Sequence, residues 1–154
     1  MRLAAAVVLL ASARQGPAPD PLGRVREMLQ RGEVADAAEA VAGLPEPART
    51  RMEAWVSLAG RDLEGARRFG ERALERNPQD PEILFLLAHV AAKQSDLDEC
   101  ARRAGDARAV RAGPWPELDA LERWLAEQRT YLERLATART RSRVAMGATL
   151  ALAA

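Results

Sequence analysis

A segment of this chain recurs after 34 residues, and the internal repeat limits the folds that the chain can adopt. The segment Asp62–Arg68 has a pattern of acidic, apolar and basic residues that is found again in Asp96–Arg102. A third, weaker copy, Glu33–Ala37, lies 29 residues before the first of these segments. Pro45 and Pro47 explain the shorter spacing, because proline would end the second helix of that unit early. A period of this length predicts similar supersecondary units stacked in a row.

Each copy has the pattern of two helices joined by a tight turn. In the best copy, Asn77–Pro81 interrupts regular structure, and Pro81 lies near the first turn of the helix that follows. Apolar residues then recur at the helical spacings of three and four, at Leu84, Leu87, Ala88 and Ala91. Residues 94–96 form the turn, and we expect Asp96 to cap a second helix that ends before Gly113.

The amino-acid composition favours helices throughout the chain. Ala, Leu, Arg and Glu dominate, and all four are strong helix formers. Aromatic residues make up only 4 % of the chain, and long β-branched or aromatic runs are missing, which argues against a sheet. The 154 residues therefore predict one all-α domain.

The repeat resembles the tetratricopeptide repeat, a helix–turn–helix unit of about 34 residues. The matching positions are Leu84, Leu87 and Ala88 in a first helix, Cys100 and Ala107 in a second, and Pro78 at the end of the preceding unit. The resemblance covers residues 20–112 and implies a right-handed helix–turn–helix solenoid of about three repeats. The unit at 81–111 matches well, whereas the unit at 48–78 has Glu53 where the family has a large apolar residue, and the unit at 20–46 is degenerate.

The resemblance also implies a binding surface, because the first helices of such repeats line a concave groove that receives a peptide or a helix. The groove residues implied in two successive units are Met52, Trp55, Phe85, Leu86, His89 and Lys93. This set is apolar with a polar end, which suits an amphipathic helix or an extended apolar peptide of another protein. In the alternative interpretation, the chain fills the groove itself with its N-terminal apolar segment or with the helix at 117–138.

A long helix is expected after the repeats, over residues 115–143. Its seam residues alternate in steps of three and four, and they are Leu118, Leu121, Leu125, Gln128, Leu132 and Leu135. In one interpretation this helix caps the last repeat, which solenoids need for solubility. In the other, residues 117–138 form a coiled coil that makes the protein a homodimer.

The two ends of the chain have patterns of their own. Residues 1–13 combine a positive start, an apolar run and an A-x-A site, as in a signal peptide; the alternative is an extra apolar helix. The apolar tail at 144–154 follows an arginine cluster and is shorter than the ~20 residues that span a bilayer. It is a helix end packed on the domain, a membrane-interface anchor or the start of a longer span. We expect a bacterial periplasmic or inner-membrane-associated protein, with the cytoplasm as the alternative.

The sequence offers little for catalysis. It has no phosphate-binding glycine loop, nucleophile elbow or metal-binding cluster, and His89 and Cys100 are the only residues of their types. The formal net charge of +1 gives no overall field that would attract nucleic acid. We therefore expect a protein–protein interaction module, not an enzyme, that works without cofactor or metal as an adaptor, assembly or co-chaperone-like factor. The alternative is a membrane-tethered structural or oligomeric subunit that uses the 117–138 helix and the apolar tail.

Overall fold

The computed structural model describes the backbone of residues 20–152 and the side chains of residues 20–139. This part of the chain contains seven helices and no strands, so the prediction of an all-α fold is confirmed. The helices are α1 (Pro21–Arg31), α2 (Val34–Ala42), α3 (Ala48–Ala59), α4 (Leu63–Arg76), α5 (Pro81–Lys93), α6 (Leu97–Val110) and α7 (Pro116–Leu152). The segment at 1–13, expected to be a signal peptide or an extra helix, lies outside the described residues.

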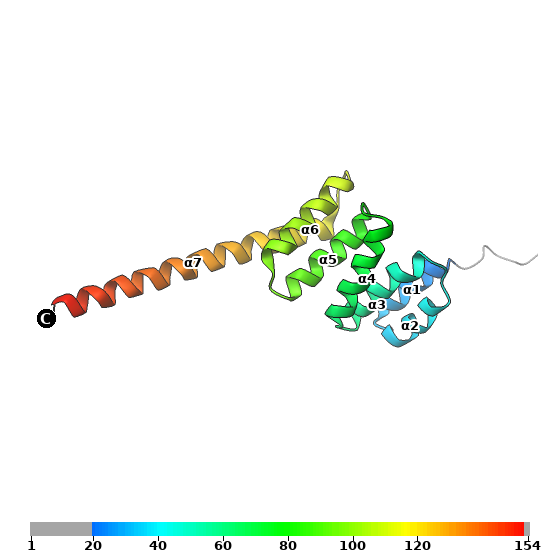
Figure 1. Ribbon diagram of the computed structural model, residues 1–154, viewed down its shortest axis with the longest axis horizontal. Helices are drawn as coiled ribbons and strands as arrows, with labels where there is room; N and C mark the ends of the chain where they lie inside the picture. The colour runs from blue at the N-terminus through cyan, green and yellow to red at the C-terminus, as the bar shows by residue number, and fades with distance from the viewer. Residues whose placement is uncertain (1–19, 153–154) are drawn as a thin grey trace, which may run out of the picture.

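The first six helices form three consecutive pairs, α1–α2, α3–α4 and α5–α6, which follow one another along the molecule (Figure 1). Helix α3 contacts both α1 and α5, so the first helices of the three pairs lie side by side. Within the described part, the second helices α2, α4 and α6 make no comparable contacts with one another. Because the first helices are the more closely spaced, the row of pairs curves toward them.

The same type of turn joins the two helices in each of the three pairs. Its left-handed residue is Gly32, Arg61 or Ser95, with φ angles of 78°, 65° and 63°. In the third pair, Ser95 N donates to Ala92 O at 3.1 Å and Asp96 N donates to Ala91 O at 3.0 Å. The first and second pairs have the same two hydrogen bonds, which define a Schellman motif. The backbone thus repeats with the spacing of the sequence copies.

Aspartate side chains cap four of the helices. Asp20 and Asp80 accept backbone hydrogen bonds at the starts of α1 and α5, and Asp62 does so at the start of α4. The predicted cap at Asp96 is confirmed, since its carboxylate accepts a hydrogen bond from Glu99 N at 3.0 Å. Each such cap contributes about 1 kcal/mol, because it satisfies a backbone N–H that the helix leaves unpaired.

Three apolar clusters lie along the molecule, two at the junctions between neighbouring pairs and one between the last pair and α7. The cluster between the first pair and α3 contains Val25, Ala37, Val41, Leu44 and Met52. The cluster around α3, α4 and α5 contains Ala54, Ala66, Ile83, Leu86, Leu87 and Val90. A third cluster joins α5, α6 and the start of α7. Trp55 of α3 packs against all three clusters and so connects the junctions.

Helix α7 has two parts with different surroundings. Its first turns cover the α5–α6 pair and bury Leu118, Leu121 and Leu125. Arg108 of α6 supports this packing by an ion pair with Glu122 at 3.0 Å. From Arg129 onward, every described side chain of α7 is exposed, and the helix runs away from the three pairs (Figure 1).

The expected boundary between a helix at 115–143 and a separate tail is absent. The helix continues without interruption to Leu152, because residues 144–152 are mostly helix formers. The 37 residues of α7 extend over about 55 Å. The interpretation in which the tail packs on the domain is wrong, since α7 carries it away from the helix pairs (Figure 1). None of the described helices has an apolar stretch long enough to cross a membrane.

Candidate functional site

An open depression lies on the face formed by the first helices of the three pairs. The apolar residues that line it are Leu29 of α1 and Met52 and Trp55 of α3. Its polar lining residues are Arg26 and Gln30 of α1 and Glu82 of α5. The depression holds about 270 Å³. It is therefore a small, largely apolar hollow with charged side chains at its edges.

An ion pair across α3 shows that this face is concave. Arg26 Nη2 of α1 donates to Glu82 Oε2 of α5 at 3.2 Å, although α3 lies between the two helices in the row. Arg51 of α3 donates to the same carboxylate oxygen at 2.7 Å, and its Nε lies 3.2 Å from Asp80 Oδ2. The two ion pairs of Glu82 are partly exposed, and such pairs stabilise a fold by only about 0.2–1 kcal/mol, so their main effect here is to position the edge of the depression.

Trp55 is the central residue of the depression. Its side chain is half-buried, packs against all three apolar clusters and lines the depression. An indole held in this way loses little conformational entropy on binding and offers both a large apolar area and an N–H donor. Residues of this type dominate the binding energy of many interfaces.

The depression brings together only two of the six predicted groove residues, Met52 and Trp55. The prediction is wrong for Leu86, which is fully buried in the cluster between α4 and α5. Adjacent residues of a helix point about 100° apart, so Phe85 and Leu86 cannot both face the same groove. Met52 is only 3 % exposed, so it contributes no more than an edge of its side chain to the depression.

The predicted groove does not continue along α5. Phe85 is buried beneath Trp115, with ring centroids 5.0 Å apart, and His89 packs edge-on against Phe85 at 4.6 Å. Burial lowers the pKa of the His89 imidazole below its ordinary value of 6.5, and the positive charge of Lys93 lowers this pKa further. Lys93 is exposed at the end of α5 and does not line the depression. The chain itself therefore covers the α5 part of the predicted groove.

Four residues of the depression are absent from the predicted set: Arg26, Leu29, Gln30 and Glu82. Three of them belong to α1, whose sequence matches the repeat pattern poorly. The spacings of the copies could have pointed to α1. Arg26 lies 29 residues before Trp55 and His89 lies 34 residues after it, so the three residues occupy equivalent positions of the copies. Equivalent positions of the three first helices thus face the same side.

The described part of the chain has neither a metal-binding cluster nor an exposed thiol. No group of three or more His, Cys, Asp or Glu side chains within them could hold a metal ion. Cys100 is fully buried, and burial raises the pKa of its thiol, which keeps it protonated and poorly nucleophilic.

Comparison with known proteins does not assign this chain to a family. No protein-family model matches the chain, and no curated protein matches it. The arrangement itself offers a concave face with a half-buried indole at its centre and ion-paired side chains at its edge.

Proposed function

We propose that this protein is an interaction module that binds an apolar segment of another protein in the depression between α1, α3 and α5. The observation that carries the proposal is the position of Trp55, whose half-buried indole lies in a concave, largely apolar hollow beside Leu29 and Met52. Burying apolar partner surface there contributes about 25 cal/mol per Å². The charges of Arg26 and Glu82 at the edge would orient the bound segment.

The size of the depression supports a peptide rather than a small molecule. Its volume of about 270 Å³ is below the ~300–1,000 Å³ of most small-molecule pockets, and it is open to solvent. A hollow of this size accommodates one or two anchor side chains, while the rest of the peptide lies along the face of the first helices. The protein would then act as an adaptor, an assembly factor or a co-chaperone-like factor.

Membership of the tetratricopeptide-like repeats is part of the same proposal. It is supported by the three equivalent left-handed turns at Gly32, Arg61 and Ser95 and by the row of first helices. In repeats of this kind the concave face receives a peptide or a helix, which is the role proposed for the depression.

Selection of peptides with a matched pair of tryptophan variants tests the proposal. Peptides are selected on the wild-type protein from a displayed random library and then titrated against Trp55→Ala and Trp124→Ala. Trp124 is half-buried like Trp55 but lies on α7, outside the depression. We expect apolar peptides that lose at least tenfold in affinity with Trp55→Ala and keep their affinity with Trp124→Ala. Circular dichroism confirms that both variants are folded.

A photo-crosslinking residue in place of Gln30 or Gln128 locates the bound peptide. Gln30 lines the depression, whereas Gln128 lies on α7. Crosslinking from position 30 supports the proposal. Selected peptides that crosslink only from position 128, or that bind Trp55→Ala as tightly as wild type, would overturn it.

A second candidate role is self-association through α7. Leu132 and Leu135 are 51 % and 37 % exposed, so the distal half of the seam is uncovered, whereas Leu118, Leu121 and Leu125 belong to the protein's own core. Sedimentation velocity tests this role with the wild type and the double variant Leu132→Gln/Leu135→Gln. A concentration-dependent dimer that the double variant abolishes supports it, and a monomeric wild type excludes it.

A further inference from the structure

The charges of this chain are separated along its length. All 22 acidic residues and 19 of the 23 basic residues lie at or before Glu133, so this part carries a formal charge of −3. The four basic residues beyond it are Arg134, Arg139, Arg141 and Arg143, with a formal charge of +4. The C-terminal end of the chain is therefore strongly basic, although the net charge of the whole chain is only +1.

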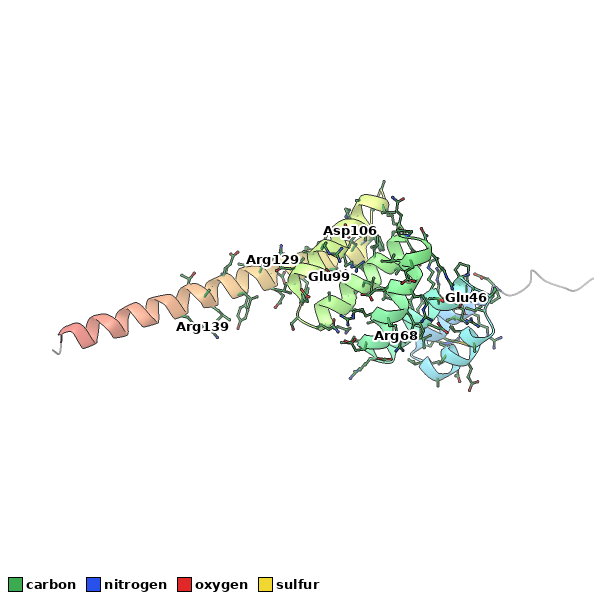
Figure 2. The ribbon with its side chains drawn as sticks, viewed as in Figure 1. Glu46, Arg68, Glu99, Asp106, Arg129 and Arg139 are labelled. Carbon is green, nitrogen blue, oxygen red and sulfur yellow. The ribbon has the colours of Figure 1, made fainter. Side chains whose placement is uncertain are left out.

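Helix α7 carries this basic end away from the three helix pairs. The last side chain of α7 in the apolar core is Leu125, and the helix continues from there to Leu152. Arg139 is exposed on the section of α7 beyond the helix pairs, and Figure 2 shows it well separated from them. At 1.5 Å per residue, Arg139 lies about 21 Å along the helix from Leu125.

This separation makes the basic end largely independent of the charges on the helix pairs. The Debye length is about 8 Å at physiological ionic strength, so charges on the helix pairs are largely screened at Arg139. An anionic surface near the end of α7 would therefore meet the four arginines largely free of the charges on the helix pairs. The acidic side chains nearest to these arginines along the chain, Glu127 and Glu133, lie on α7 itself.

The sequence after the arginines indicates which anionic surface is involved. Residues 144–154 contain no charged side chain and consist mostly of Ala, Leu, Val and Met. Nucleic acid offers no partner for such a stretch, whereas a lipid surface offers anionic headgroups beside an apolar interior.

We infer that the distal end of α7 binds an anionic lipid surface, with the arginines at the headgroups and the apolar stretch in the acyl region. The proximal part of α7 then holds the three helix pairs, and the depression at Trp55, away from the lipid. Electrostatic attraction and apolar burial act together here, and each alone supports only weak binding. The inference does not depend on the peptide-binding role of the depression.

Vesicle co-sedimentation of the full chain tests this inference. The probes are vesicles of phosphatidylcholine alone and of phosphatidylcholine mixed with phosphatidylglycerol. We expect binding to the mixed vesicles that weakens as salt is raised, and little binding to phosphatidylcholine alone. Each arginine near such a surface contributes about fivefold in affinity, which corresponds to about 1 kcal/mol. The variant with all four distal arginines changed to Gln is expected to lose several hundredfold.

Two further variants make the test specific. The control changes Arg24, Arg61, Arg72 and Arg123 to Gln, which removes the same charge from exposed positions elsewhere in the chain. This control and wild type should bind alike, and deletion of 144–154 should weaken binding while keeping the preference for anionic vesicles. The inference is overturned if wild type ignores anionic vesicles, if both fourfold variants lose equally, or if wild type binds duplex DNA instead of vesicles.

Discussion

The ring of Trp115 packs on the ring of Phe85, with centroids 5.0 Å apart and planes inclined by 42°. The guanidinium of Arg111 lies over the same indole, 4.4 Å from its centroid. Trp115 immediately precedes α7, so this contact attaches the start of α7 to α5. It also closes the α5 end of the concave face and confines the open depression to α1, α3 and the first turn of α5.

Replacement of Trp115 by alanine should lower the free energy of unfolding more than replacement of any other tryptophan. Trp115 is 5 % exposed, and Trp115→Ala would leave a cavity beside Phe85 and release the start of α7. We expect a loss of about 3–5 kcal/mol in the free energy of unfolding, measured by urea denaturation. Trp124→Ala is the control, because Trp124 is only half-buried. Equal losses for the two variants would contradict this assignment.

Two glycines in helices should respond oppositely to replacement by alanine. A Cβ atom at Gly70 of α4 would lie 2.9 Å from Leu87 Cδ2 and 3.2 Å from Leu87 Cγ, and Leu87 is buried. Such overpacking costs about 1–3 kcal/mol, which exceeds the gain of about 0.5–1 kcal/mol from replacing a helical glycine. At Gly105 of α6 a Cβ atom would meet nothing within 4 Å. Thermal unfolding should therefore show Gly70→Ala destabilised and Gly105→Ala stabilised; two shifts of the same sign would refute the packing argument.

The turn between α3 and α4 should be stabilised by a glycine. Arg61 has a φ of 65°, a conformation that costs residues with a side chain about 1–2 kcal/mol. Gly32 occupies the equivalent position of the first pair, with a φ of 78°. We expect Arg61→Gly to raise the free energy of unfolding by about 1 kcal/mol, and Arg72→Gly, within α4, to lower it by a similar amount. Chemical denaturation measures both, and a destabilised Arg61→Gly would contradict the expectation.

The stability of the protein should fall in acid partly because of Glu46, which connects the α2–α3 loop to α4 (Figure 2). Its carboxylate accepts a hydrogen bond from Thr50 at 2.8 Å and others from Arg76 at 2.6 Å and Arg49 at 2.9 Å. These contacts lower the pKa of Glu46 from 4.5 to about 2. The folded state then binds fewer protons than the unfolded state between these values, so the contribution is present above pH 4.5 and is lost as the pH falls toward 2.

Denaturation of Glu46→Gln at a series of pH values measures this contribution. The variant should be less stable than wild type at pH 7, and the difference should shrink between pH 4.5 and pH 2. Glu75→Gln, at an exposed position of α4, is the charge-matched control for the loss of one carboxylate. A constant difference between Glu46→Gln and wild type would show that the carboxylate does not titrate as assigned.

His89 should titrate below its ordinary pKa of 6.5, because burial disfavours the charged imidazole and Lys93 repels it. A lowered pKa means that the folded state binds fewer protons, so stability should decline as the pH falls below 6.5. An NMR titration of the imidazole gives the midpoint directly. Lys93→Gln should raise this midpoint without bringing it to 6.5, since burial is the larger cause. A midpoint at or above 6.5 in wild type would show that the imidazole is not buried as described.

Features that depend on residues close in sequence could be predicted well. The cap at Asp96 and the start of α5 at Pro81 follow from local turn chemistry, and both are observed. The candidate site was harder to predict, because α1 contributes Arg26, Leu29 and Gln30 although its sequence departs from the repeat pattern. Curvature of the row of helices, and not a recognisable motif, brings these residues to the depression.

The sequence by itself determined the helical composition, the repeat spacing and the places where turns occur, since periodicity, capping and proline act over a few residues. Only the tertiary structure decided which part of the concave face stays open. Phe85 and Trp115 are 30 residues apart, and their contact depends on the path of the chain after α6. Whether a half-apolar face meets solvent or another helix depends on such long-range packing, and the helical pattern is the same in either case.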